Sequence, residues 1–295
     1  MKQRWIFLML SAVAGFAHAS VKLEDGLQVE VRGEGRPVLF IPGLNSAAST
    51  WDASCEALRK DGVQCHLLQL PGFAGLAALP DQATQPFLPV MRSRVLAYIE
   101  RAKLDRPAVV GHSLGGALAL MLAIEAPDKI GDLVIVDSLP FFPAATNPAA
   151  TSDMMLPMAE GMRTSMQAQT DEAYFQQAKA AASMGMSRDP ARVAAIQQWG
   201  QDSARSATTQ AMFELFTMDL RPQLDQVKAR TRVLGAWAAY QPMGSTLEST
   251  RGIFEAQYAT LQGVEIAMAP NAYHFIMFDD PEWLVEQVSA FLSTP

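Results

Sequence analysis

The sequence predicts an α/β fold with a mostly parallel central sheet, helices on both faces and an inserted helical cap. Short apolar runs alternate with helical segments, and this alternation is typical of βαβ units. It stops between about residues 141 and 225, where the chain becomes helical and rich in methionine after Pro143 and Pro148. We expect this insertion to lie over the carboxyl ends of the strands, where ligands bind in parallel sheets.

The strands divide the chain into a core of residues 20–140 and 226–295 and a cap of residues 141–225. The cap methionines, such as Met154 and Met184, either line an adaptable apolar pocket or hold the cap helices together. The runs expected as strands are 27–32, 37–41, 63–68, 108–111, 133–137, 232–237 and 264–268.

Residues 1–19 have the pattern of a secretory signal peptide. Lys2 and Arg4 precede an apolar run that ends at Ala17, and Ala17-His18-Ala19 forms a small-residue cleavage site. The run is short for a membrane span, although an uncleaved anchor remains an alternative. The sequence therefore predicts a periplasmic or secreted protein cleaved after Ala19, without stable membrane insertion.

Composition points to a small-molecule partner. The formal net charge is −7 and no basic stretch occurs, which argues against nucleic acid. Cys55 and Cys65 form either a disulfide or two buried thiols, since both are compatible with a helix followed by a strand. No second Cys/His cluster accompanies them, so neither a metal site nor a cofactor is expected.

Gly111-His112-Ser113-Leu114-Gly115 lies between an expected buried strand and a helix rich in small residues. This strand, turn and helix context is typical of a nucleophile elbow, in which glycines allow the serine to occupy a strained turn. The N-terminus of the helix favours negative charge that develops beside the serine. We therefore expect Ser113 to be a catalytic nucleophile.

A serine hydroxyl needs a neighbouring base, and the chain has only four histidines. His18 leaves with the signal peptide, His66 lies in an expected buried strand, and His112 points away from the adjacent serine of the elbow. His274, in the loop after the last expected strand, is therefore the candidate base.

The oxyanion donors and the acid that orients the base are the remaining parts of the expected site. The backbone N–H groups of Leu114 and Leu44 are the expected oxyanion donors, with Asn45 as an alternative to Leu44. Asp137 ends the strand after the elbow and is the expected acid, although it could instead cap the turn through Ser138. The turn after the strand 232–237 contains no carboxylate, and Glu248 lies further on in an expected helix.

These residues resemble the α/β-hydrolase superfamily, in its group of capped esterases and lactonases, over essentially the whole mature chain. The resemblance implies an α/β-hydrolase fold and acyl-transfer chemistry. It rests on Gly111 to Gly116, Pro42-Gly43-Leu44 with Trp51 beyond it, Leu70-Pro71-Gly72-Phe73, and His274-Phe275 followed by Asp280-Pro281.

The chain departs from many relatives at three places. It has Pro42-Gly43 where His-Gly is common, Gln69 where Asp is common, and no acid after the strand 232–237. In this last respect it is similar to haloalkane dehalogenases and zearalenone-type lactonases, whose acid follows the strand after the elbow, as Asp137 does. Dehalogenases and epoxide hydrolases need Asp as nucleophile, so Ser113 excludes both chemistries.

The expected function is therefore that of a serine hydrolase that cleaves a small carboxylic ester or lactone through an acyl-enzyme. An amidase or aminopeptidase with the same triad is one alternative, with Glu160, Asp171 and Glu172 available to hold a substrate amine. A non-catalytic ligand-binding protein of the same fold is another.

Overall fold

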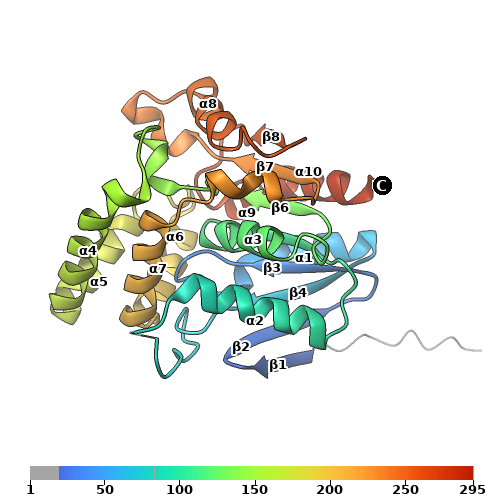
Figure 1. Ribbon diagram of the computed structural model, residues 1–295, viewed down its shortest axis with the longest axis horizontal. Coiled ribbons are helices and arrows are strands. Elements are labelled where there is room, and N and C mark those ends of the chain that lie inside the picture. The colour runs from blue at the N-terminus through green and yellow to red at the C-terminus, as the bar shows by residue number, and fades with distance from the viewer. Residues whose placement is uncertain (1–19, 83, 295) are drawn as a thin grey trace, which may run out of the picture.

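The computed structural model describes residues 20–82 and 84–294, so the expected signal peptide lies outside the described residues. Within them, eight strands form one sheet in the order β1-β2-β4-β3-β5-β6-β7-β8 (Figure 1). β2 pairs antiparallel with β1 and β4, and every other neighbouring pair is parallel. The expected fold class is confirmed. The strands are β1 (Ser20–Glu24), β2 (Leu27–Arg32), β3 (Arg36–Ile41), β4 (Val63–Gln69), β5 (Ala108–His112), β6 (Leu133–Val136), β7 (Thr231–Gly235) and β8 (Glu265–Met268).

All the strands expected from the sequence are present, with ends that differ by at most two residues. β1 was not expected. It forms a hairpin with β2 through Asp25-Gly26, both of which have positive φ values of 53° and 81°. An Asp-Gly pair between two strands is a strong hairpin signal, so the sequence did contain the information for β1.

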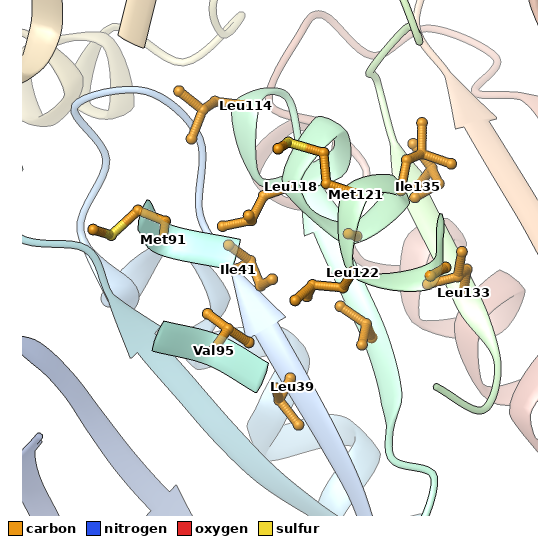
Figure 2. Packing of buried hydrophobic residues seen from close by; sticks show 14 of the residues in the cluster. Leu39, Ile41, Met91, Val95, Leu114, Leu118, Met121, Leu122, Leu133 and Ile135 are labelled. Carbon is orange, nitrogen blue, oxygen red and sulfur yellow. The ribbon is translucent and has the colours of Figure 1, made fainter. Parts of the chain in front are cut away.

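Helices cover both faces of the sheet because successive strand residues point to opposite sides. Leu39 and Ile41 of β3 pack with α2 and α3 on one face, as Figure 2 shows. Val38 and Phe40 belong to the cluster on the other face, with side chains from α1 and α10. Outside the insertion, the helices are α1 (Asp52–Leu58), α2 (Phe87–Arg101), α3 (Leu114–Glu125), α8 (Leu247–Gln257), α9 (Ile276–Asp279) and α10 (Pro281–Ser293).

Between β6 and β7 the chain forms α4 (Ser152–Ala168), α5 (Asp171–Ala182), α6 (Pro190–Gln201) and α7 (Arg205–Thr217), which lie beside the core in Figure 1. The side chains of Met154, Met158 and Met184 are exposed, so these three methionines do not hold the helices together.

Helix α7 is attached to the core through Glu214. The buried carboxylate accepts hydrogen bonds from the N–H groups of Phe87 and Leu88, both at 2.6 Å. These two amides begin α2 and have no acceptor within that helix. Burial raises the pKa of Glu214 above its ordinary value, and the bonds from Gln210 and the two amides oppose this rise.

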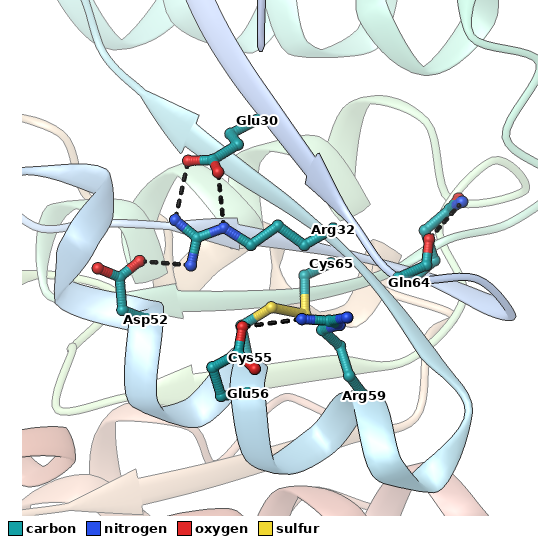
Figure 3. The surroundings of a disulfide bond; sticks show 9 residues. Glu30, Arg32, Asp52, Cys55, Glu56, Arg59, Gln64 and Cys65 are labelled. Carbon is teal, nitrogen blue, oxygen red and sulfur yellow. Dashed lines mark hydrogen bonds and ion pairs between the residues drawn. A yellow bond between two sulfur atoms is a disulfide. The ribbon is translucent and has the colours of Figure 1, made fainter. Parts of the chain in front are cut away.

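A disulfide joins Cys55 of α1 to Cys65 of β4, with 6.0 Å between their Cα atoms (Figure 3). The disulfide alternative is therefore the one the structure contains. Arg32 of β2 reinforces the same region because its guanidinium pairs with Asp52 of α1 at 2.8 Å. Among the described residues, no helix combines the length and apolar character that crossing a membrane requires.

Candidate active site

Ser113 stands in the tight turn between β5 and α3. Its backbone has φ 53° and ψ −120°, a conformation that non-glycine residues adopt only when the surroundings enforce it. The Ser113 N–H donates to Val136 O of β6 at 2.9 Å, and Ser113 O accepts from Gly116 N at 2.8 Å. A Cβ on Gly111 would lie 2.2 Å from Gly115 O, so strand and helix approach too closely there for any side chain. The sequence around Ser113 thus fixes the turn.

Asp137 directly follows β6 and holds His274. Asp137 Oδ2 lies 2.6 Å from His274 Nδ1, and Oδ1 accepts a 2.8 Å hydrogen bond from Ala236 N. Asp137 N donates to Leu234 O at 2.7 Å, so both the backbone and the carboxylate of Asp137 are hydrogen-bonded to β7 or to the residue after it. The carboxylate accepts the proton on Nδ1, which leaves the Nε2 lone pair of a neutral His274 free to accept another proton. The Asp137 and His274 side chains are 10% and 21% exposed.

His112 connects the elbow to the loop of His274. The fully buried imidazole lies 3.0 Å through Nε2 from the carbonyl oxygen of His274, and its ring packs against Phe275 with 4.5 Å between centroids. Burial, together with the nearby His274, lowers the pKa of His112 well below its usual range. A neutral His112 therefore donates from Nε2 to His274 O. Sequence reasoning identified His112 only as pointing away from Ser113 and missed this contact.

Of the two expected oxyanion donors, Leu114 follows Ser113 in sequence, whereas Leu44 belongs to a turn that approaches Ser113 in space. Leu114 is the first residue of α3, so its N–H has no acceptor within the helix. Gly43, which precedes Leu44, lies so close that a Cβ on it would be 3.2 Å from Ser113 Cβ. Within residues 20–82 and 84–294, neither the Leu44 N–H nor the Leu114 N–H donates to a backbone carbonyl in a turn, in a loop or at a helix end. Both amides are therefore available to a ligand atom beside Ser113.

The side chains of Asn45 and Gln69 hold the turn that carries Leu44. Asn45 has a φ of 56°, and its Oδ1 accepts a 2.7 Å hydrogen bond from Thr208 of α7. Gln69 Oε1 accepts from Ala48 N at 2.7 Å, and Nε2 donates to Ser46 O at 3.3 Å. Gln69 thus supports this turn through both atoms of its side-chain amide. These contacts were not predicted, because they join segments far apart in sequence.

The expected site residues follow the carboxyl ends of β3, β5, β6 and β8, where Asp137 pairs with His274 and Gly43 lies against Ser113. Ser113 and Asp137 follow adjacent parallel strands, and His274 lies in the loop after β8. The resulting arrangement has a hydroxyl at a strained turn, an imidazole held by a carboxylate, and free amides. Among the described residues, no group of three or more His, Cys, Asp or Glu side chains is arranged to hold a metal ion.

A family model described as "Alpha/beta hydrolase family" matches residues 38–287. The "Putative carbamate hydrolase RutD" of Rhizobium rhizogenes is 23% identical over 90% of this chain and 97% of its own length. The pimeloyl-[acyl-carrier protein] methyl ester esterase of Nitrosomonas europaea is 28% identical over 39% of this chain, and the match spans 42% of that esterase.

The fold is similar to that of solved structures. The enol-lactonase of Burkholderia xenovorans LB400 superposes with a TM-score of 0.72, at 16% identity, over 93% of this chain and 100% of the lactonase. Since the family model covers most of the chain, the resemblance seen in the sequence is confirmed. This chain belongs to the alpha/beta hydrolase family.

Proposed function

We propose that this protein is a serine hydrolase that cleaves a small carboxylic ester or lactone through an acyl-enzyme intermediate. The observation that carries the proposal is the 2.6 Å pairing of Asp137 Oδ2 with His274 Nδ1, formed on the strand next to the Ser113 elbow. A carboxylate that orients an imidazole beside a serine is the arrangement that activates a hydroxyl nucleophile.

In this mechanism, Ser113 Oγ forms a bond to the substrate carbonyl carbon while His274 Nε2 takes the hydroxyl proton. The carbonyl π electrons move to oxygen, and the Leu44 and Leu114 amides donate hydrogen bonds to the resulting oxyanion. When this intermediate collapses, His274 protonates the leaving alcohol oxygen and the acyl-enzyme remains. Water then attacks the acyl carbon and gives a proton to His274; the bond between the acyl carbon and Ser113 Oγ breaks, the carboxylic acid leaves, and His274 returns the proton to Ser113 Oγ. Asp137 stabilises the imidazolium in both halves.

An ester or lactone fits better than an aminopeptidase substrate. A cap that holds a substrate amine needs carboxylates directed toward the serine, and the candidates were Glu160, Asp171 and Glu172. All three residues are exposed in the structure, and Asp171 pairs with Arg205 at 2.5 Å. The methyl ester esterase and enol-lactonase named above also support an oxygen leaving group.

A series of p-nitrophenyl esters of increasing acyl length tests the proposal, with an aminoacyl p-nitroanilide beside it. We expect ester turnover with one preferred acyl length, much slower anilide cleavage, and covalent labelling of Ser113 by a fluorophosphonate probe. Efficient cleavage of the anilide alone would replace the esterase proposal with an amidase. A protein inert to all substrates and to the probe would be the non-catalytic ligand-binding alternative.

The proposal includes a periplasmic or secreted location, with residues 1–19 removed as a signal peptide. The Cys55–Cys65 disulfide supports this location, because such bonds persist in oxidising compartments. Cell fractionation followed by N-terminal sequencing should recover a chain that begins at Ser20 outside the cytoplasm. A full-length chain in the cytosol would contradict the location, and a full-length chain in the membrane fraction would indicate an uncleaved anchor.

A further inference from the structure

The loop that carries His274 is bound by the insertion as well as by the core. His274 N donates to Gly185 O at 3.1 Å, and Phe275 N donates to Met186 O at 2.8 Å. Gly185 and Met186 lie between α5 and α6. Two consecutive backbone amides, one of them that of the proposed base itself, therefore depend on the position of the loop between these helices.

The carboxylate of Asp279, at the end of α9, joins the same two segments. On the insertion side, Oδ1 accepts from Ser187 Oγ at 2.6 Å and from Arg188 N at 3.0 Å. On the side of the base, Oδ2 accepts from Tyr273 N, the residue before His274, at 2.8 Å. A charged acceptor makes stronger hydrogen bonds than a neutral one, so this is a firm connection.

The next residue, Asp280, provides a contrast. Its Oδ1 accepts from Trp283 N at 3.4 Å, and this bond caps the first turn of α10. Asp280 has the same charge and nearly the same place in the chain, yet this bond serves α10 and not the loop of His274. It is a matched control for Asp279.

We propose that Asp279 is a positioning residue. It holds the His274 imidazole in position against Asp137 and couples that position to the insertion loop of residues 185–188. This inference rests on the proposed function, in which His274 is the base. Any movement of α5 and α6 as substrate enters is then transmitted to the backbone of the base. An imidazole displaced by about 1 Å loses about 100-fold in rate, because proton transfer requires close alignment.

The test compares Asp279→Asn with Asp280→Asn. The Asp279→Asn amide keeps one acceptor oxygen but places an N–H₂ donor against existing donors. We expect kcat on a p-nitrophenyl ester to fall about 10- to 100-fold with KM nearly unchanged. The rate of fluorophosphonate labelling should fall by a similar factor. Asp280→Asn should keep kcat at the wild-type value, because asparagine retains an oxygen that can cap α10, and equal kcat values for the two variants would overturn the proposal.

Ser187→Ala tests the contribution of the insertion loop to the position of His274. It also replaces Asp279→Asn as the test if that variant fails to fold. Ser187→Ala removes the hydrogen bond that Ser187 Oγ donates to Asp279 and the one that it accepts from Asp189 N, and it leaves the backbone of His274 untouched. We expect a smaller fall in kcat, and the double variant should be no slower than Asp279→Asn alone, since both act through one carboxylate. A wild-type rate in Ser187→Ala, or fully additive effects, would remove the insertion from the proposal.

Proton NMR gives a readout that does not depend on substrate. The Nδ1 proton shared by His274 and Asp137 should give a low-field resonance in the wild type and in Asp280→Asn, and this signal should shift or disappear in Asp279→Asn. An unchanged signal in Asp279→Asn would overturn the positioning role. A wild-type protein that shows the signal but cleaves no ester would contradict the proposed function instead.

Discussion

Ser113→Ala is expected to reduce kcat on the preferred ester by about 10⁴-fold or more while the protein remains folded. In the proposed mechanism the variant lacks the atom that forms the acyl-enzyme, so only general binding and the proposed oxyanion donors remain. The Ser113 hydroxyl does not cap α3, and alanine fits the same turn, so little stability depends on the oxygen. Steady-state kinetics and a thermal melt of both proteins measure the two effects.

Ser93→Ala is a suitable control for Ser113→Ala. Ser93 is exposed on α2, and its hydroxyl donates to Pro89 O within that helix. It should retain the wild-type rate. In wild type, a fluorophosphonate should add its mass to the peptide that contains Ser113, and this label should be absent in Ser113→Ala. If Ser113→Ala kept more than about 1% of the activity, the nucleophile would lie elsewhere.

The parts of the site that could be predicted are those encoded over short stretches of sequence. Ser113 is flanked by a buried strand, a helix of small residues and two close glycines, and the structure requires each of these features. Asp137 could be placed because strands that follow one another in βαβ units often pair, and β6 does pair with β5. His274 followed by elimination among four histidines.

The parts that could not be predicted are contacts between distant segments. His112 and His274 are 162 positions apart, and nothing in the elbow motif indicates that the buried imidazole bonds the carbonyl of His274. The same holds for Asp279, whose partners Ser187 and Arg188 belong to the insertion. A period of 3.6 residues reports which helix face is apolar but not which loop the helix will place beside another. The support for the candidate site therefore became visible only in the folded chain.

Asp137→Asn should lower kcat by about 10³- to 10⁴-fold with little change in KM, because it reverses the tautomer of His274. Ala236 N already donates to Asp137 Oδ1, so an asparagine keeps its oxygen there and turns its N–H₂ group toward His274 Nδ1. Nδ1 then becomes an acceptor, and the imidazole proton moves to Nε2, the nitrogen that accepts the proton of Ser113 in the proposed mechanism.

The control for Asp137→Asn is Glu248→Gln, which removes the other carboxylate considered from the sequence. Glu248 is exposed in the first turn of α8, and we expect its replacement to leave kcat unchanged. Steady-state kinetics of both variants on one ester separate the two candidates. A nearly full rate in Asp137→Asn together with a large loss in Glu248→Gln would assign the acid to Glu248. We expect the opposite result, a large loss in Asp137→Asn and none in Glu248→Gln. This result would mean that Asp137 orients the base, since within the described part of the chain Asp137 has a hydrogen bond to His274 and Glu248 has none.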